Sequence, residues 1–208
     1  MARYFSIHPD DPQPRLLAQA ADILRSGAVV ALPTDSCYCL GCRLGDKEAL
    51  DRIRQIKNLD DRHHLTLMCR DLSEIAQFAR VDNAQYRLLK ASTPGSYVFI
   101  LEGTKELPRR VMHPKRKTIG LRIPDHKTAL ALLEELKEPL LTSTLVLPGD
   151  EFPLTEGWEI QERLDDQIEL ILDGGYCGTT TTTVIDMTAL PPTLMRAGRG
   201  PLAPFGLE

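Results

Sequence analysis

The sequence predicts a single α/β domain in which helices pack around a mixed β-sheet. Helical and extended patterns alternate from one end of the chain to the other, and the last two predicted strands have the close spacing of a hairpin. Strands interleaved with helices, together with a hairpin, are typical of a sheet with both parallel and antiparallel neighbours. No repeat, low-complexity linker or change of composition divides the chain, so we expect one domain over residues 1–208.

The predicted helices follow from apolar residues that recur at helical spacing. Residues 14–26 place Leu17, Ala21 and Leu24 on one face, and Gly27 follows where this helix is expected to end. The remaining predicted helices are 47–57, one that Asp71 and Glu74 would cap, 82–92, and 126–138, which has the clearest amphipathic pattern.

The predicted strands are short apolar runs rich in Val, Ile, Leu and Thr. The first of them stops at Pro33, because proline cannot donate to a sheet and is disfavoured inside a central strand. The expected strands are residues 28–33, 65–69, 97–103, 118–124, 140–144, 168–175, 182–187 and 193–196.

Composition indicates a soluble, cytoplasmic protein. Hydrophobic residues make up 42% and charged residues 26% of the chain, which is ordinary for a globular domain. The N-terminal residues lack the apolar core of a secretory signal, and no apolar stretch is long enough to span a bilayer, so we expect no membrane partner. Of five cysteines, Cys37, Cys39 and Cys42 crowd one segment without a second ligand pair nearby, so reduced thiols are favoured over zinc.

Positive charge is concentrated in one stretch of a chain whose net charge is −4. By contrast, the segment from Asp150 to Asp173 is rich in acidic residues. This asymmetry could create one positive face, or the basic stretch could be a solvated loop. The residues of the basic stretch are Arg109, Arg110, Lys115, Arg116 and Lys117.

The standard phosphate-binding loops, G-x-x-x-x-G-K-[ST] and G-x-G-x-x-G, are absent. Nucleotide binding would therefore depend on cations and hydroxyls around a cavity. Thr34 and Asp35 follow a buried strand, although both could instead cap a turn. Arg122 lies inside an apolar strand, where a charge needs a partner or a ligand to offset its desolvation. The same reasoning applies to Arg196, near the C-terminus. The run 142–144 adds three hydroxyls, which could also reflect the β-propensity of threonine.

Five sequence runs, in order and across nearly the whole chain, resemble the successive motifs of the YrdC-like family. They are PTDSCYCLG (33–41), TPGSYVFIL (93–101), IGLRIPDH (119–126), LLTST (140–144) and TTVIDMT (182–188) followed by LMRAG (194–198). Three other runs resemble the YciO branch of that family: LTLMCRDL (65–72), GTKELPRR (103–110) and KRKTIG (115–120).

The resemblance implies a twisted mixed sheet, surrounded by helices, with a large, concave and basic cavity. Members of the TsaC type make threonylcarbamoyl-AMP, a nucleotidyl transfer that uses threonine, bicarbonate and ATP with Mg²⁺ as substrates, for the threonylcarbamoyladenosine modification of tRNA. No tightly bound cofactor is implied. AMP, tRNA and double-stranded RNA are further partners that the resemblance suggests.

The resemblance also implies roles for individual residues. Thr34 and Arg122 would hold the amino acid, and Lys57 and Arg122 would be catalytic. Because the reaction needs little proton transfer, positioning and cationic stabilisation of phosphate would supply most of the catalysis. The nucleotide would be contacted by Lys57, Thr142, Ser143 and Arg196, and RNA by Arg109, Arg110, Lys115, Arg116 and Lys117.

Two departures from the synthase motifs weaken this expectation. The K-x-R motif reads Lys57-Asn58-Leu59, and the S-x-N motif reads Ser143-Thr144-Leu145. Each lost charge-assisted hydrogen bond is worth roughly 1.5–3 kcal/mol, or about tenfold to a hundredfold in rate. Arg54 or Arg62 could substitute for the lost arginine. The sequence thus predicts a weak or specialised synthase, with a non-catalytic protein that binds double-stranded RNA through the same basic cavity as the alternative.

Overall fold

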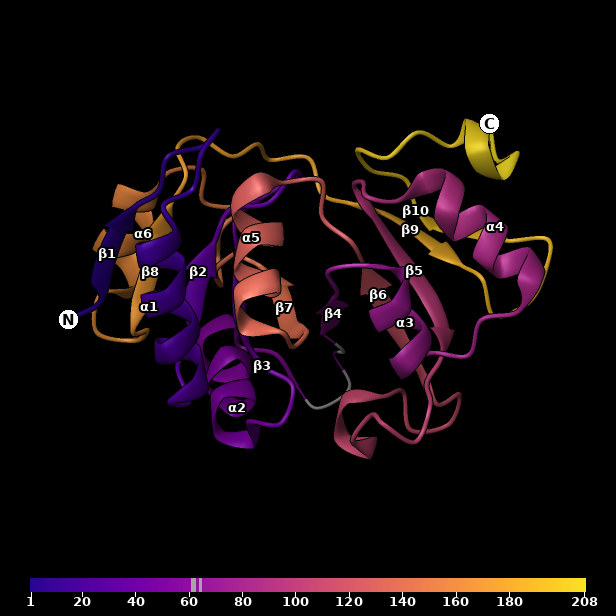
Figure 1. Ribbon diagram of the computed structural model, residues 1–208, viewed down its shortest axis with the longest axis horizontal. Coiled ribbons are helices and arrows are strands. Elements are labelled where there is room, and N and C mark those ends of the chain that lie inside the picture. Colours follow the sequence, from indigo (N-terminus) through magenta and orange to yellow (C-terminus); the bar gives the residue numbers. More distant parts are fainter. Residues whose placement is uncertain (61–62, 64) are drawn as a thin grey trace.

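The computed structural model describes residues 1–60, 63 and 65–208. Ten strands of this part form one sheet in the order β1-β8-β2-β3-β7-β4-β6-β5-β9-β10 (Figure 1). They are β1 (Arg3–Ser6), β2 (Val30–Leu32), β3 (Cys39–Arg43), β4 (Thr66–Met68), β5 (Tyr97–Glu102), β6 (Thr118–Arg122), β7 (Leu140–Thr144), β8 (Leu170–Asp173), β9 (Thr183–Asp186) and β10 (Thr193–Arg196).

Six α-helices and two short 3-10 helices surround the sheet in the described residues. In Figure 1, α1 and α5 lie side by side over one half of the sheet, and α3 and α4 lie over the other half. The helices are α1 (Pro14–Arg25), α2 (Lys47–Lys57), α3 (Leu72–Phe78), α4 (Asn83–Ser92), α5 (Lys127–Leu136), α6 (Gly157–Leu164), η1 (Arg109–Val111) and η2 (Ala203–Phe205).

The strand pairing is mixed, which confirms the predicted fold class. Four neighbouring pairs run parallel: β1–β8, β2–β8, β4–β6 and β5–β9. The antiparallel pairs are β2–β3, β3–β7, β4–β7, β5–β6 and β9–β10. The hairpin expected near the end of the chain is β9–β10.

The centre of the sheet is buried on both faces. Side chains alternate between the faces of a strand, and in β2 both Val30 and Leu32 join a hydrophobic cluster built with α1 and α5. The neighbouring Val29 and Ala31 belong to a larger cluster, to which α2, α3, α4 and α6 contribute. Such two-sided burial explains why β2 appears in the sequence as a continuous apolar run.

All the predicted helices and strands are present. Two strands and one α-helix were missed, as were the two short 3-10 helices. β1 has four residues, and β3 contains Gly41 in a segment for which no strand was predicted. The missed helix α6 lies in the acidic segment and begins at Gly157, after Glu156, whose side chain makes no capping hydrogen bond. Within the described ranges, none of the helices has the length and apolarity needed to cross a bilayer.

Candidate active site

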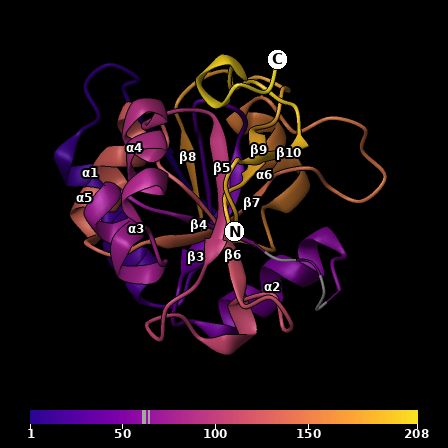
Figure 2. The same cartoon turned by 90° about the vertical axis from the view of Figure 1, so that its right-hand side faces the viewer.

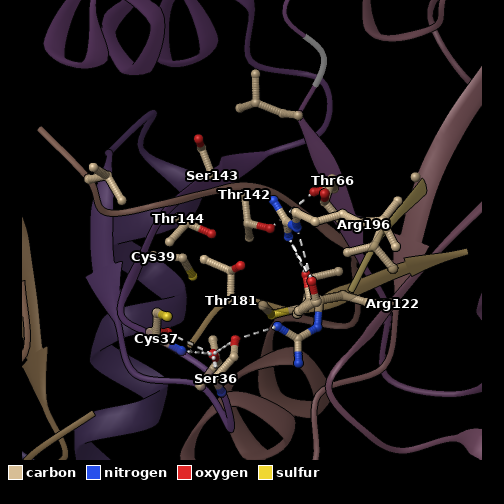
Figure 3. Close-up of a pocket in the computed structure, with 18 of the residues that line it drawn as sticks. Ser36, Cys37, Cys39, Thr66, Arg122, Thr142, Ser143, Thr144, Thr181 and Arg196 are labelled. Atoms are coloured by element: carbon tan, nitrogen blue, oxygen red, sulfur yellow. Dashed lines mark hydrogen bonds between the residues drawn. The ribbon is translucent and has the colours of Figure 1, made fainter. Parts of the chain in front are cut away.

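A cavity of about 420 Å³ lies over the central strands β3 to β7 and is bordered by Thr34, Ser36 and Cys37, the end of α2, β9 and β10 (Figure 3). This volume is within the range of small-molecule sites. The strand register aligns Thr142 and Gly120 with Thr66 in one row across the sheet. A Cβ on Gly120 would lie 2.7 Å from Val98 Cγ1, so glycine permits this close approach at the cavity floor.

Three basic side chains line the cavity: Lys57, Arg122 and Arg196. No carboxylate is among the described residues that line it. This local excess of positive charge occurs in a chain of net charge −4. Such an arrangement favours an anionic ligand, because the low-dielectric walls strengthen each charge interaction.

Arg122, in β6, is the cation with the most partners. Its side chain is 6% exposed and forms a salt bridge with Asp35, whose side chain is 10% exposed. It also donates to Ser36 Oγ and to the carbonyl oxygen of Gly95, both at 3.3 Å. Its Nε is buried without a partner in the structure. Arg122 therefore has a preset position, and one donor remains unsatisfied.

The turn after β2 supplies the partner of Arg122. Thr34 Oγ1 accepts from the backbone amides of Ser36 at 3.1 Å and Cys37 at 3.2 Å, and donates to the carbonyl of Cys37 at 2.6 Å. The hydroxyl of Thr34 therefore caps the turn, which is one of the two roles that the sequence suggested. Thr34 also lines the cavity. Asp35 does not cap the turn in this way; it pairs with Arg122 across 87 positions of sequence.

Lys57 reaches the cavity because α2 ends there. Asn58 adopts the left-handed conformation, with φ of 51°, and terminates the helix immediately after Lys57. The lysine Nζ donates to Ser143 Oγ at 2.5 Å. Burial lowers the pKa of Lys57 to about 8, and a small opposing effect comes from Cys39.

Arg196, in β10, faces the cavity from the opposite side to β7 (Figure 3). Its guanidinium donates from Nε and Nη2 to the carbonyl of Thr182 at 3.1 and 2.8 Å, and from Nη2 to Thr182 Oγ1 at 3.0 Å. Burial lowers the pKa of Arg196, and Cys37 partly offsets this, but an arginine stays charged.

The remaining hydroxyls of the cavity come mainly from β7. Thr142 Oγ1 donates to the carbonyl of Thr66 at 3.1 Å, so it keeps acceptor capacity toward the cavity. Thr144 and Thr181 also line the cavity (Figure 3). The structure therefore brings together all six small-molecule residues that the sequence suggested: Thr34, Lys57, Arg122, Thr142, Ser143 and Arg196.

Sequence reasoning missed the apolar half of the lining. Val98 and Ile100 in β5 and Val184 in β9 face the cavity. Side chains alternate between the two faces of a strand, and this pattern can be seen in the sequence. When both faces are buried, however, the pattern does not tell which face borders a cavity. Cys37 and Cys39 also line the cavity.

The five cysteines are free and buried. Burial raises the pKa of Cys39, Cys42 and Cys177 to about 12 in each case, so these thiols are protonated and unreactive. Among the residues that the structure describes, no cluster of His, Cys, Asp or Glu side chains could hold a metal ion.

The basic stretch forms an exposed loop, here called the basic loop (Arg109, Arg110, Lys115, Arg116 and Lys117). It lies at the lower end of β5 and β6, in both views, whereas β10 lies toward the upper end (Figure 2). Arg110 Nη2 donates to the carbonyl of Gly45 at 3.4 Å, just before α2. None of the five residues lines the cavity. The cavity and the basic loop are therefore separate features.

The two departures from the synthase motifs occupy different environments. Leu59 is half-buried beyond the end of α2, and its backbone amide bonds the carbonyl of Arg54 at 2.8 Å. Leu145 is fully buried in the main hydrophobic cluster. Neither leucine lines the cavity, and neither does Arg54, whose nearest acid is Asp51 at 4.0 Å. Arg62, the other suggested substitute, lies outside the described residues.

Residues 22–198 match the family model described as "Telomere recombination", which represents the Sua5, YciO and YrdC proteins. The chain belongs to the Sua5/YciO/YrdC family. This confirms the family resemblance that the ordered sequence motifs indicated, including that to the YciO branch.

Relatives within the Sua5/YciO/YrdC family fall into two groups. The YciO protein of Escherichia coli is 53% identical over 205 residues, 99% of this chain and 100% of that protein, and its crystal structure superposes with a TM-score of 0.94. The threonylcarbamoyl-AMP synthase of Pyrococcus abyssi is 31% identical over 185 residues, 88% of this chain but 54% of the synthase. The crystal structure of P. abyssi Sua5 complexed with L-threonine, 28% identical, covers 96% of this chain and 58% of its own, with a TM-score of 0.88.

Proposed function

We propose that the cavity binds an adenine nucleotide together with a small amino acid, and that the protein is a weak or specialised threonylcarbamoyl-AMP synthase. One observation carries this proposal: three cations and several hydroxyls converge on a cavity that has no carboxylate among its described lining residues. Family members that share the fold are named for this activity, although the chain spans little more than half of their length.

The residues of the cavity suit the steps of this reaction. Threonine and bicarbonate form a carbamate, whose oxygen attacks the α-phosphorus of ATP and displaces pyrophosphate with its Mg²⁺. Arg122, preset by Asp35, suits the amino-acid carboxylate, whereas Lys57 and Arg196 suit phosphate oxygens. The walls of the cavity would shield the carbamate from part of the surrounding water.

The departures at Leu59 and Leu145 support weak rather than efficient synthesis. The charge-assisted hydrogen bonds that they remove are each worth about 1.5–3 kcal/mol. If these bonds act in the transition state, each loss slows synthesis by about tenfold to a hundredfold. A substrate that needs fewer contacts to the leaving pyrophosphate, such as a related adenylate, would lose less.

Isothermal titration with ATP and threonine, separately and together, tests the proposal. We expect ATP or AMP to bind at micromolar to millimolar Kd, and Lys57→Ala to weaken this binding because it removes a phosphate contact. Lys47→Ala is the matched control, since Lys47 is exposed on the same helix. No detectable binding at millimolar nucleotide would contradict the enzyme proposal.

The basic loop supports a second candidate function, sequence-independent binding of tRNA or double-stranded RNA. All five cations are exposed, and none forms a salt bridge within the part of the chain that the structure describes. Exposed and unneutralised cations are available to phosphates. Because the basic loop does not line the cavity, the two functions could be separated by mutation.

A further inference from the structure

We propose that Lys57 and Ser143 act as a base–nucleophile pair that cleaves activated carbamoyl groups in the cavity. The substrate class is a mixed anhydride of a carbamic acid and a nucleotide phosphate. The proposal rests on the proposed function for the identity of this substrate, and the pair itself rests on the geometry below.

The two side chains meet without a competing partner among the residues that the structure describes. Lys57 Nζ lies 2.5 Å from Ser143 Oγ, within the distance required between a nucleophile and its base. Lys57 appears in no salt bridge of the described residues, and Ser143 is its sole hydrogen-bond partner there. They lie 86 positions apart in sequence, so the fold, and not a local turn, brings them together. A serine activated by a lysine is a known alternative to the serine–histidine pair.

The surroundings keep the lysine available as a base. Burial lowers the pKa of Lys57 to about 8, so about a tenth of the molecules carry a neutral amine at pH 7. Arg54 lies one turn earlier on α2, outside the cavity lining. Besides Lys57, the ionisable side chains that line the cavity in the described residues are Cys37, Cys39, His63, Arg122 and Arg196. Arg122 is neutralised by Asp35, and among the described residues no carboxylate lines the cavity to raise the pKa of the amine.

The chemistry is balanced without a further reagent. Neutral Lys57 takes the proton of Ser143 as Oγ bonds to the carbamoyl carbon, and the bond from that carbon to the phosphate oxygen breaks. The nucleotide leaves as its phosphate anion, which Arg196 can stabilise from the other side of the cavity. Lys57 then releases its proton to solvent, and water hydrolyses the carbamoyl-serine to Ser143 and a carbamate, which loses CO₂ to give the free amine.

The departures from the synthase motifs are consistent with this role. An arginine beside Lys57 would help to bind the leaving pyrophosphate of a polyphosphate substrate. Leu59 stands at that place and does not line the cavity. The cavity therefore retains a nucleophile and a base while it has lost groups for a polyphosphate. Such a site can cleave an adenylate even where its synthesis of that adenylate is weak.

Covalent labelling with 4-nitrophenyl N-methylcarbamate tests the pair without a nucleotide. Intact-mass and peptide mass spectrometry of the full-length protein should show one methylcarbamoyl group on Ser143. The labelling rate should rise about tenfold per pH unit up to about pH 8 and then level off, because the base must be neutral. Lys57→Met should slow labelling on the order of a hundredfold and remove this pH dependence.

Controls separate the pair from background reactivity. Ser143→Ala should abolish labelling at this position, and Ser143→Cys should restore it. Lys47→Met, the same change at an exposed position of α2, should label like the wild type. Circular dichroism melting verifies that each variant is folded. Wild-type protein left unlabelled at Ser143, or labelled equally fast as Lys57→Met, would overturn the proposal.

The same samples are titrated with ATP and incubated with threonylcarbamoyl-AMP, with AMP release measured by chromatography. Nucleotide binding without Ser143 labelling overturns the pair and leaves the synthase proposal intact. Labelling without nucleotide binding supports the pair and contradicts the synthase proposal. Release of AMP that falls at least tenfold in both Ser143→Ala and Lys57→Met supports the pair and its substrate together.

Discussion

The cations of the cavity and those of the basic loop have the same charge but opposite surroundings. Arg122 is almost fully buried and is held by a carboxylate, a hydroxyl and a carbonyl. The cations of the basic loop are exposed, and Arg110 makes a single long bond to a carbonyl. A buried charge depends strongly on its partners, whereas an exposed charge is solvated and screened. Residue type alone therefore says little about what a cation contributes.

The difference also separates stability from binding. Replacing a cavity cation should change both the folded state and ligand affinity, in a direction set by its partners. Replacing a cation of the basic loop should change long-range attraction and leave the fold intact. Of the four predictions below, three test this contrast between cations and one compares a buried with a half-buried leucine; they run from the largest expected effect to the smallest.

Arg122→Ala should lower the free energy of unfolding by about 3–5 kcal/mol, because it leaves the buried carboxylate of Asp35 unpaired. The double change Arg122→Met with Asp35→Asn removes both charges and should be less destabilising. Reversal of Arg110, Lys115 and Lys117 to Glu should change stability by less than about 0.5 kcal/mol. Urea unfolding measures all three. If Arg122→Ala and the loop variant had equal free energies of unfolding, the proposed difference between buried and exposed cations would be wrong.

Leu145→Asn should cost about 2–4 kcal/mol of stability, because an amide would replace a fully buried side chain in the hydrophobic cluster. Leu59→Arg, at a half-buried position, should be nearly neutral in stability. In a variant that restores both synthase residues, a change in activity could therefore come from lost stability and not from the restored contacts. Leu59→Arg alone should raise threonylcarbamoyl-AMP formation, measured by product chromatography. A folded Leu59→Arg with wild-type activity would show that this leucine does not limit synthesis.

Lys57→Met should raise the free energy of unfolding by roughly 1–3 kcal/mol at pH 7, because a charged amine is no longer buried. In the wild type the pKa falls from 10.5 in the unfolded chain to about 8 in the fold. Unfolding then takes up a proton between these values, so wild-type stability rises with pH and the advantage of the variant shrinks. Thermal melting at pH 7 and pH 10 measures this. A destabilised Lys57→Met would mean that the lysine is a structural residue.

Reversal of Arg110, Lys115 and Lys117 to Glu should weaken duplex RNA binding through counterion release. If a handful of phosphates is contacted, log K against log[salt] should slope by about −3 to −5 for the wild type and be flatter for the variant. Fluorescence anisotropy over a salt series gives the slopes, and nucleotide affinity should stay nearly unchanged. Equal slopes would identify the basic loop as a solvated loop without a role in RNA binding.

The sequence by itself predicted most elements of the fold. Local patterns indicated α1 through Leu17, Ala21 and Leu24, and the cap predicted at Asp71 lies where α3 begins. Such signals are carried by neighbouring residues, so they can be seen without the fold. The elements that were missed, β1, β3 and α6, have short, glycine-containing or uncapped sequences.

The family motifs also predicted which polar residues belong to the cavity, but not how they interact. The position of Asp35 beside Arg122 and of Lys57 beside Ser143 depends on pairs separated by 87 and 86 positions. The sheet order places β7 between β3 and β4, although α2 to α5 separate them in the chain. Burial then decides which cation is paired and which amine loses part of its charge. Only the tertiary structure determines these properties, because strand register and solvent exclusion involve residues distant in sequence.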